Sequence, residues 1–124
     1  MEISEVRDIV RKGGDVARYR AEEARGLRAA VPTGATVVAL DERGTEYDSL
    51  SFAAWLGQQR DRSVPAMAFL IGGPDGLDPD LRASAQRTWS LGRLTLPHEL
   101  ARLVLLEQLY RAGSILQGTP YHRE

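Results

Sequence analysis

The sequence predicts an α/β domain in which helices flank a mainly parallel β-sheet. Two runs of apolar and β-branched residues carry this prediction, ATVVALD at residues 35–41 and AMAFLIG at residues 66–72. Nearly continuous apolar runs are typical of strands buried on both faces, as parallel strands are. Helical segments lie between and after these runs, so strands and helices alternate along the chain. No repeat, linker or low-complexity tract divides residues 1–124, and we expect a single domain.

Two further elements are predicted before the first apolar run. Residues 2–6 (EISEV) alternate weakly, which is consistent with a short strand. Residues 15–30 are rich in Ala, Arg and Glu and predict a helix. The VPTG sequence at 31–34 predicts a turn, and so do residues 42–44 after the strand.

The second half of the chain continues the alternation. A helix is predicted at residues 51–59, with Ser49 or Ser51 as its N-cap. Asp78 is the expected N-cap of a helix whose first turn begins with Pro79 and which runs to about residue 87.

The C-terminal part is predicted to hold a third strand and the longest helix. The strand is TWSLG at residues 88–92, and the helix starts at Pro97 and ends near residue 112. Its apolar residues include helical spacings and are expected in the core or at a dimer interface: Leu100, Leu103, Val104, Leu106 and Leu109.

Composition excludes several classes of site. There is no cysteine, which rules out disulfides, thiolate zinc sites and cysteine nucleophiles. With only two histidines, far apart in sequence, we expect no metal. No stretch approaches the roughly 20 apolar residues that cross a bilayer. The N-terminal MEISEVRDIVRKGG lacks an apolar signal core, so we expect a cytoplasmic location and no membrane partner.

The basic residues are almost all arginine, 15 of 16. The guanidinium fork suits phosphate groups and stacks on bases, although a GC-rich genome also explains such a bias. Because the net charge is −1, any RNA-binding surface must be local or built by two subunits together.

Suggestive residues stand at the ends of the predicted strands. In open α/β sheets, ligands bind outside the carboxyl ends of the strands. The GGPDG sequence at residues 72–76 gives a ligand room to approach main chain, and a tight strand-to-helix turn explains it equally well. It is neither a dinucleotide fingerprint nor a Walker loop. The nearby acids fit helix capping: Asp75, Asp78 and Asp80.

A few polar and aromatic side chains could handle a nucleotide. Tyr121, His122 and Arg123 combine a stacking ring, a titratable imidazole and a phosphate-binding fork. His98 stands at a helix start, where a structural role also explains it. Both tryptophans, Trp55 and Trp89, are expected in the core or at an interface.

Long ordered motifs in this chain resemble the RlmH type of SPOUT methyltransferase. They are FLIGGPDGL and WSLGRLTLPHELARLVLLEQLYRAGSILQGTPYHRE, dense over residues 66–124 and looser back through VVALDERG. That family methylates N3 of a pseudouridine in the 23S ribosomal RNA of the large subunit. The resemblance implies a C-terminal trefoil knot, a homodimer, S-adenosyl-L-methionine as cofactor and the ribosome as partner. It also implies a single SPOUT methyltransferase domain at residues 1–124 that is N-terminally shortened, because the family's first strand and helix have no counterpart here.

The resemblance also implies roles for individual residues. The positions expected to line the cofactor are Leu40, Gly73, Gly92, Arg93, Leu94, Thr95, Leu96 and Pro97. Tyr121, His122 and Arg123 are expected beside the transferred methyl group, and His98 and Arg111 in the pocket for the target base. The base nitrogen attacks a methyl group on a sulfonium, so positioning supplies most of the catalysis. His122 is the expected acceptor of the N3 proton.

Two other functions are compatible with parts of this pattern. A shortened, knotted dimeric module could bind cofactor or RNA without transferring a methyl group, but the intact GGPDG, SLGRLTLPH and PYHRE motifs argue against it. A dinucleotide-binding oxidoreductase would need a glycine fingerprint and a spaced acidic ribose partner, which the sequence lacks.

Overall fold

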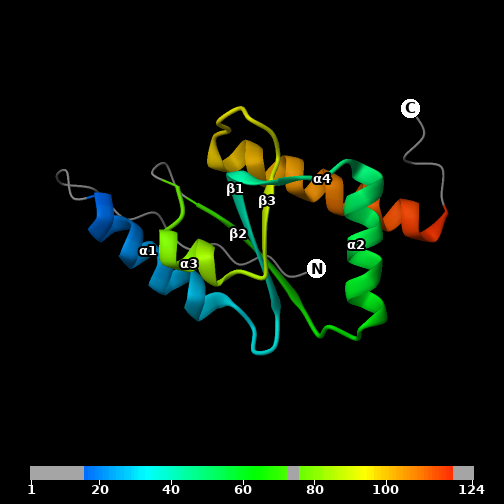
Figure 1. The fold of residues 1–124 in the computed structure, drawn as a ribbon, viewed down its shortest axis with the longest axis horizontal. Helices are drawn as coiled ribbons and strands as arrows, with labels where there is room; N and C mark the ends of the chain where they lie inside the picture. Colours follow the sequence, from blue (N-terminus) through cyan, green and yellow to red (C-terminus); the bar gives the residue numbers. More distant parts are fainter. Residues whose placement is uncertain (1–15, 73–75, 119–124) are drawn as a thin grey trace.

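The computed structural model describes residues 16–72 and 76–118 of the chain (Figure 1). The predicted strand at residues 2–6 lies outside this part. The described helices and strands, in chain order, are α1 (Val16–Ala30), β1 (Thr36–Glu46), α2 (Ser49–Asp61), β2 (Met67–Ile71), α3 (Pro79–Ser84), β3 (Arg87–Ser90) and α4 (His98–Gln117).

The strands form a parallel sheet with β1 in the middle. Their order is β2-β1-β3, and both neighbours run parallel to β1. Leu40 pairs with Ile71 on one side and with Trp89 on the other, so the three strand ends meet at one edge. The predicted α/β class with a parallel sheet is therefore confirmed.

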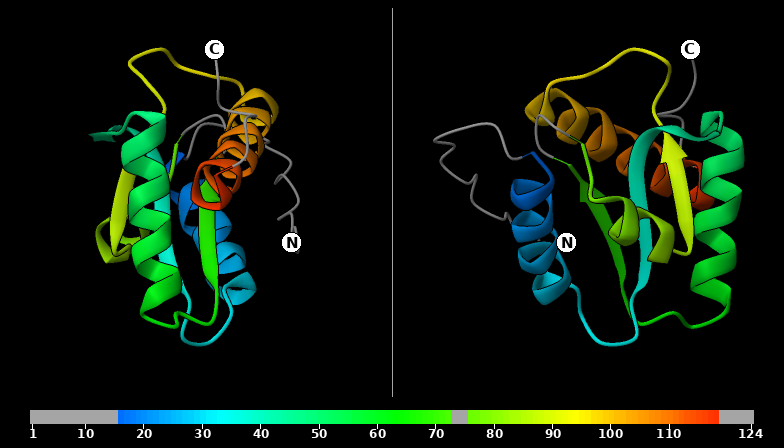
Figure 2. Two further views of the ribbon diagram at one scale, coloured as in Figure 1. Left: turned by 90° about the vertical axis from the view of Figure 1, so that its right-hand side faces the viewer. Right: turned by 60° about the vertical axis from the view of Figure 1, so that its left-hand side comes forward.

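Helices cover both faces of this sheet (Figures 1 and 2). Val38 and Leu40 point to the face covered by α2 and α4, where Phe52 stacks on Trp89 with ring centroids 4.2 Å apart. Ala39 points to the opposite face, where α1 and α3 pack. This alternation along β1 is what a strand buried on both sides requires.

The sequence prediction differs from the structure just after the buried part of β1. Residues 42–44 do not end the strand, because β1 continues to Glu46. The pairing with β3 shifts register between Leu40 and Thr45, both of which are partners of Trp89. An irregularity of this kind absorbs extra residues within a strand, so the polar DERG sequence stays in the sheet.

The N-cap of α2 was also predicted wrongly. Asp48, and not Ser49 or Ser51, caps the helix, and its carboxylate accepts a 2.7 Å hydrogen bond from the Ser51 backbone N–H. Ser51 is the residue whose N–H needs a cap, so it cannot provide one itself.

Of the later helices, α3 begins where predicted, α4 begins one residue after the predicted Pro97, and both end elsewhere. Asp78 caps α3 as expected, accepting from Leu81 N at 3.1 Å, with Pro79 first in the helix. The helix stops at Ser84, and Gln86 bonds β1: its side chain accepts from Val37 N at 2.7 Å and its own N–H donates to Val37 O at 3.0 Å. The helix α4 ends only at residue 117, beyond the predicted end near 112.

Candidate active site

The order of the strands creates a natural ligand position between β1 and β2. From β1 the chain leaves toward α2 on one face of the sheet, whereas from β2 it leaves toward α3 on the other face. Neighbouring strands whose connections diverge in this way open a crevice outside their carboxyl ends, the usual ligand position in open α/β sheets. Leu40 and Gly72 stand at these two ends.

Residues 91–97, the crossing loop, pass over this position (Figure 2). The loop starts after β3, on the far side of β1 from β2. It ends at His98, whose Nδ1 lies 3.2 Å from the Gly72 carbonyl oxygen after β2. Because a carbonyl can only accept, this bond requires the proton on Nδ1. The crossing loop therefore spans the end of the central strand.

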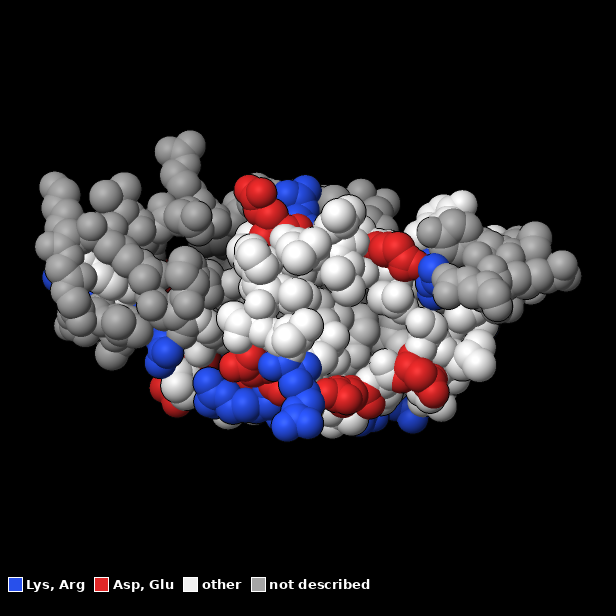
Figure 3. Space-filling view, turned by 90° about the horizontal axis from the view of Figure 1, so that it is seen from above, with Lys and Arg blue, Asp and Glu red and all other residues white. Residues whose placement is uncertain are grey.

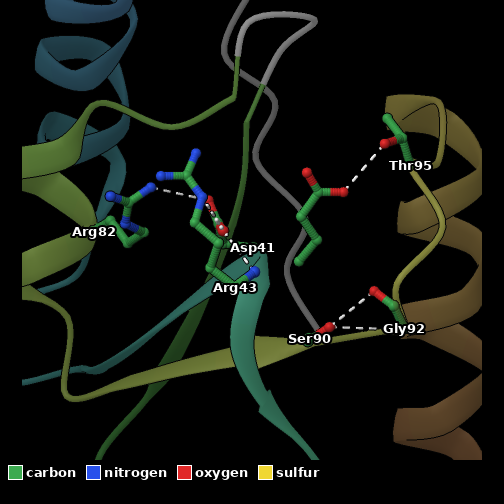
Figure 4. Close-up of polar contacts among 7 residues, drawn as sticks. Asp41, Arg43, Arg82, Ser90, Gly92 and Thr95 are labelled. Atoms are coloured by element: carbon green, nitrogen blue, oxygen red, sulfur yellow. Dashed lines mark hydrogen bonds and ion pairs between the residues drawn. The ribbon is translucent and has the colours of Figure 1, made fainter.

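The crossing loop is held at its start by Ser90. The buried Ser90 hydroxyl donates to Gly92 O at 2.9 Å and accepts from Gly92 N at 3.1 Å. Further along, the Thr95 hydroxyl donates to Glu42 Oε2 at 3.1 Å (Figure 4). Among the described residues, no backbone–backbone hydrogen bond engages residues 93–96.

The glycine loop, residues 72–76, begins with a close main-chain contact. A Cβ atom on Gly72 would lie 2.7 Å from Gly76 C and from Leu77 N. This crowding requires glycine at position 72 whether or not a ligand binds, so the turn explanation holds for this residue. Gly73 lies outside the described residues.

A charged group lies beside these loops. Asp41 follows the buried part of β1, and its side chain is only 7% exposed. Its Oδ2 accepts from Arg82 Nη1 at 3.2 Å, and its Oδ1 accepts from the Arg43 backbone N–H at 2.9 Å (Figure 4). A nearly buried carboxylate is stable only with such partners.

The structure places some predicted residues together and separates others. Leu40 ends the buried part of β1, and the residues from Gly92 to Pro97 belong to the crossing loop above it. His98 joins this group, but Arg111 lies 13 residues further along α4, about 20 Å away at 1.5 Å per residue. Arg111 bonds Glu107 Oε1 at 2.6 Å. The predicted Tyr121, His122 and Arg123 lie outside the described residues.

Sequence reasoning gave no role to Glu42 and Arg82. The one available signal was position, because Asp41 and Glu42 directly follow an apolar run. Within the described ranges there is no cluster of His, Asp or Glu suited to a metal ion, and no helix long and apolar enough to span a bilayer.

Residues 1–122 match a protein-family model described as "Predicted SPOUT methyltransferase". The chain belongs to the SPOUT methyltransferase family. Its relatives include three proteins named ribosomal RNA large subunit methyltransferase H. The one from Rhodopseudomonas palustris (strain HaA2) is 54% identical over 109 residues, covering 88% of this chain and 68% of the relative. The one from Hydrogenovibrio crunogenus is 48% identical, covering 91% and 72%, and the one from Polynucleobacter necessarius 53%, covering 84% and 76%.

These matches confirm the predicted resemblance to RlmH-type methyltransferases and, with it, the predicted class of enzyme. Methyl transfer by this family is consistent with a ligand site where the end of the buried part of β1, Gly72 and the crossing loop come together.

Proposed function

We propose that this SPOUT enzyme methylates N3 of a pseudouridine in the 23S ribosomal RNA of the large subunit, with S-adenosyl-L-methionine as donor. The observation that carries the proposal is the crossing loop. It lies over the ligand position of an α/β sheet and leaves the main chain of residues 93–96 without backbone partners among the described residues. The names of the relatives support ribosomal RNA as the substrate and, with it, a cytoplasmic location.

The residues of the crossing loop fit a cofactor bound through main-chain groups. A Cβ on Gly92 would meet no atom within 4 Å, and the Leu94 side chain is 80% exposed, so there is room beside the loop. Peptide N–H and C=O groups recognise the edge of an adenine regardless of side-chain identity. We assign Leu40, Gly73 and residues 92–97 to cofactor binding on this basis.

S-adenosyl-L-methionine supplies a methyl group on a sulfonium, which is already a good leaving group. The protein therefore contributes mainly the orientation of donor and target base, together with a group that accepts the N3 proton. We assign the His122 imidazole as acceptor of the N3 proton, Tyr121 as the ring that stacks on the target base, and Arg123 as a phosphate contact.

The proposed enzyme is a homodimer, and its C-terminal half forms the family's trefoil knot. Leu100, Leu103 and Tyr110 lie three and seven residues apart on α4, which puts them on one side of the helix. They are 44%, 62% and 66% exposed. Figure 3, which views the molecule from above its orientation in Figure 1, shows an area of side chains other than Asp, Glu, Lys and Arg, bordered by acidic and basic ones. Because His98 and Arg111 are so far apart on one helix, a target pocket holding both needs residues from two copies.

Two measurements test the proposed function. Calorimetry tests binding of S-adenosyl-L-methionine, and radiolabelled donor tests methyl transfer to ribosomes that lack the modification. We expect both, with His122→Ala abolishing transfer while leaving donor affinity near the wild-type value. Asp61→Ala, at the far end of α2, is the control and should leave both unchanged.

The outcomes separate the competing functions. Donor binding without methyl transfer would favour a binding module. A chain that does not bind the donor would refute the proposed methyltransferase function. If His122→Ala left transfer unchanged while Tyr121→Ala abolished it, the assignment of the base would be wrong.

A further inference from the structure

Two adjacent acids after the buried part of β1 reach toward different segments of the candidate site. Asp41 Oδ2 accepts from Arg82 on α3 at 3.2 Å, whereas Glu42 Oε2 accepts from Thr95 in the crossing loop at 3.1 Å. Successive side chains of an extended strand point to opposite sides. The two carboxylates can therefore bind partners on both sides of the strand end at once (Figure 4).

The Asp41 contact fixes the segment that follows the glycine loop. The Asp41 side chain is 7% exposed and that of Arg82 22% exposed, so water screens this ion pair less than a surface pair. The short helix α3 is held from its other side by Leu81, which is 2% exposed in the core. Asp41 thus ties the end of β1 to a firmly packed helix.

The Glu42 contact holds the middle of the crossing loop. The loop is anchored at its start by Ser90 and at its end by the bond from His98 to Gly72. Between them, Thr95 to Glu42 is the hydrogen bond that residues 93–96 make within the described ranges. Without it, these residues would have more conformations to lose when a ligand binds.

Three contacts thus surround the end of the buried part of β1. Arg82 donates to Asp41, Thr95 donates to the adjacent Glu42, and His98 bonds the Gly72 carbonyl oxygen. We propose that Asp41 and Glu42 are positioning residues that hold α3 and the crossing loop in place for the methyl donor. This inference rests on the proposed function, and it assigns Glu42 an effect on donor affinity that acts through Thr95.

A double-mutant cycle tests the coupling between Glu42 and Thr95. The affinity for S-adenosyl-L-methionine is measured by calorimetry for Glu42→Ala, Thr95→Val and the double variant. Since an exposed hydrogen bond contributes little, we expect Glu42→Ala to weaken binding about two- to tenfold. The same change should have almost no effect in the Thr95→Val background.

Two outcomes of the cycle would overturn the role of Glu42. One is an unchanged donor affinity in Glu42→Ala. The other is an equal loss in both backgrounds, which would mean that Glu42 does not act through Thr95. Asp61→Ala removes an acid that is 72% exposed at the other end of α2 and serves as the matched control.

Amide hydrogen exchange tests the inference without any ligand. We expect Glu42→Ala to speed exchange at the Gly92 amide, which donates to Ser90 Oγ at the start of the crossing loop. Asp41→Asn should speed exchange at the Leu81 and Arg82 amides, which donate to Asp78. Both are compared with Asp61→Ala. Unchanged exchange at both segments would overturn the inference. If the wild type failed to bind the donor, the proposed function would fall, while the exchange data would still decide whether the two acids hold α3 and the crossing loop.

Discussion

Replacing Gly72 by alanine tests the packing on which the site is built. The added Cβ would lie 2.7 Å from two main-chain atoms of Gly76 and Leu77, whereas ordinary contacts begin at 3.4 Å. Gly76 and Leu77 must therefore move by about 0.7 Å, the difference between those distances. Neither contact is a flexible side-chain end that could turn away. Overpacking of this kind costs about 1–3 kcal/mol of unfolding free energy.

The assay is urea unfolding at a fixed protein concentration, since dimer formation would add to the apparent stability. The matched control is Gly113→Ala in α4, where the new Cβ would meet nothing within 4 Å. There alanine should stabilise the helix by about 0.5–1 kcal/mol. Glycine to alanine should therefore lower the unfolding free energy at position 72 and raise it at position 113. If Gly72→Ala were as stable as the wild type, the close main-chain contact would not exist in solution.

Three further changes test the core, the cap of α3, and the pH dependence of the cap of α2. Phe52→Ala removes a ring that is 2% exposed and stacked on Trp89, and should lower the unfolding free energy by about 3–5 kcal/mol; a loss below about 1 kcal/mol would contradict this packing. Asp78→Ala removes the cap of α3 and should cost about 1 kcal/mol in the same urea assay, and no loss would contradict the cap. The Ser51 N–H and hydroxyl hold the pKa of Asp48 below its ordinary value. Stabilisation by Asp48 is therefore present above about pH 4 and is lost as the pH falls through the lowered pKa. The stability difference between wild type and Asp48→Asn should shrink below about pH 4, and a constant difference would refute this.

The fold was predictable from the sequence wherever burial determined it. The runs around Val38 and Leu70 are apolar because both faces of their strands are covered, so composition alone identified them. The polar stretch after Asp41 carried no such signal. It remains in the sheet partly because Gly44 lets β3 approach, since a Cβ there would lie 2.5 Å from Thr88 O. A contact between residues 44 positions apart cannot be recognised from either local sequence.

The candidate site was predictable in part, and for a different reason. Local turn chemistry identified Asp78 and the glycine loop, and long shared motifs identified the crossing loop. Neither showed that His98 meets Gly72, because that contact depends on the order of the strands. Glu42 escaped notice for the same reason, since its partner Thr95 is 53 residues away.

The strand order also explains why three separate segments must cooperate at this site. Because β1 lies between β2 and β3, a chain that leaves β3 can reach Gly72 only by passing over the end of β1. The side chains of this loop are largely exposed, and residues 93–96 make no backbone–backbone hydrogen bond to the described part of the chain. Its shape must then be set by neighbours, and Ser90, Glu42 and Gly72 each supply one contact from a different strand end. Side chains outside the loop thereby decide how its main chain is presented, which is why Asp41 and Glu42 should matter for a donor that they do not touch.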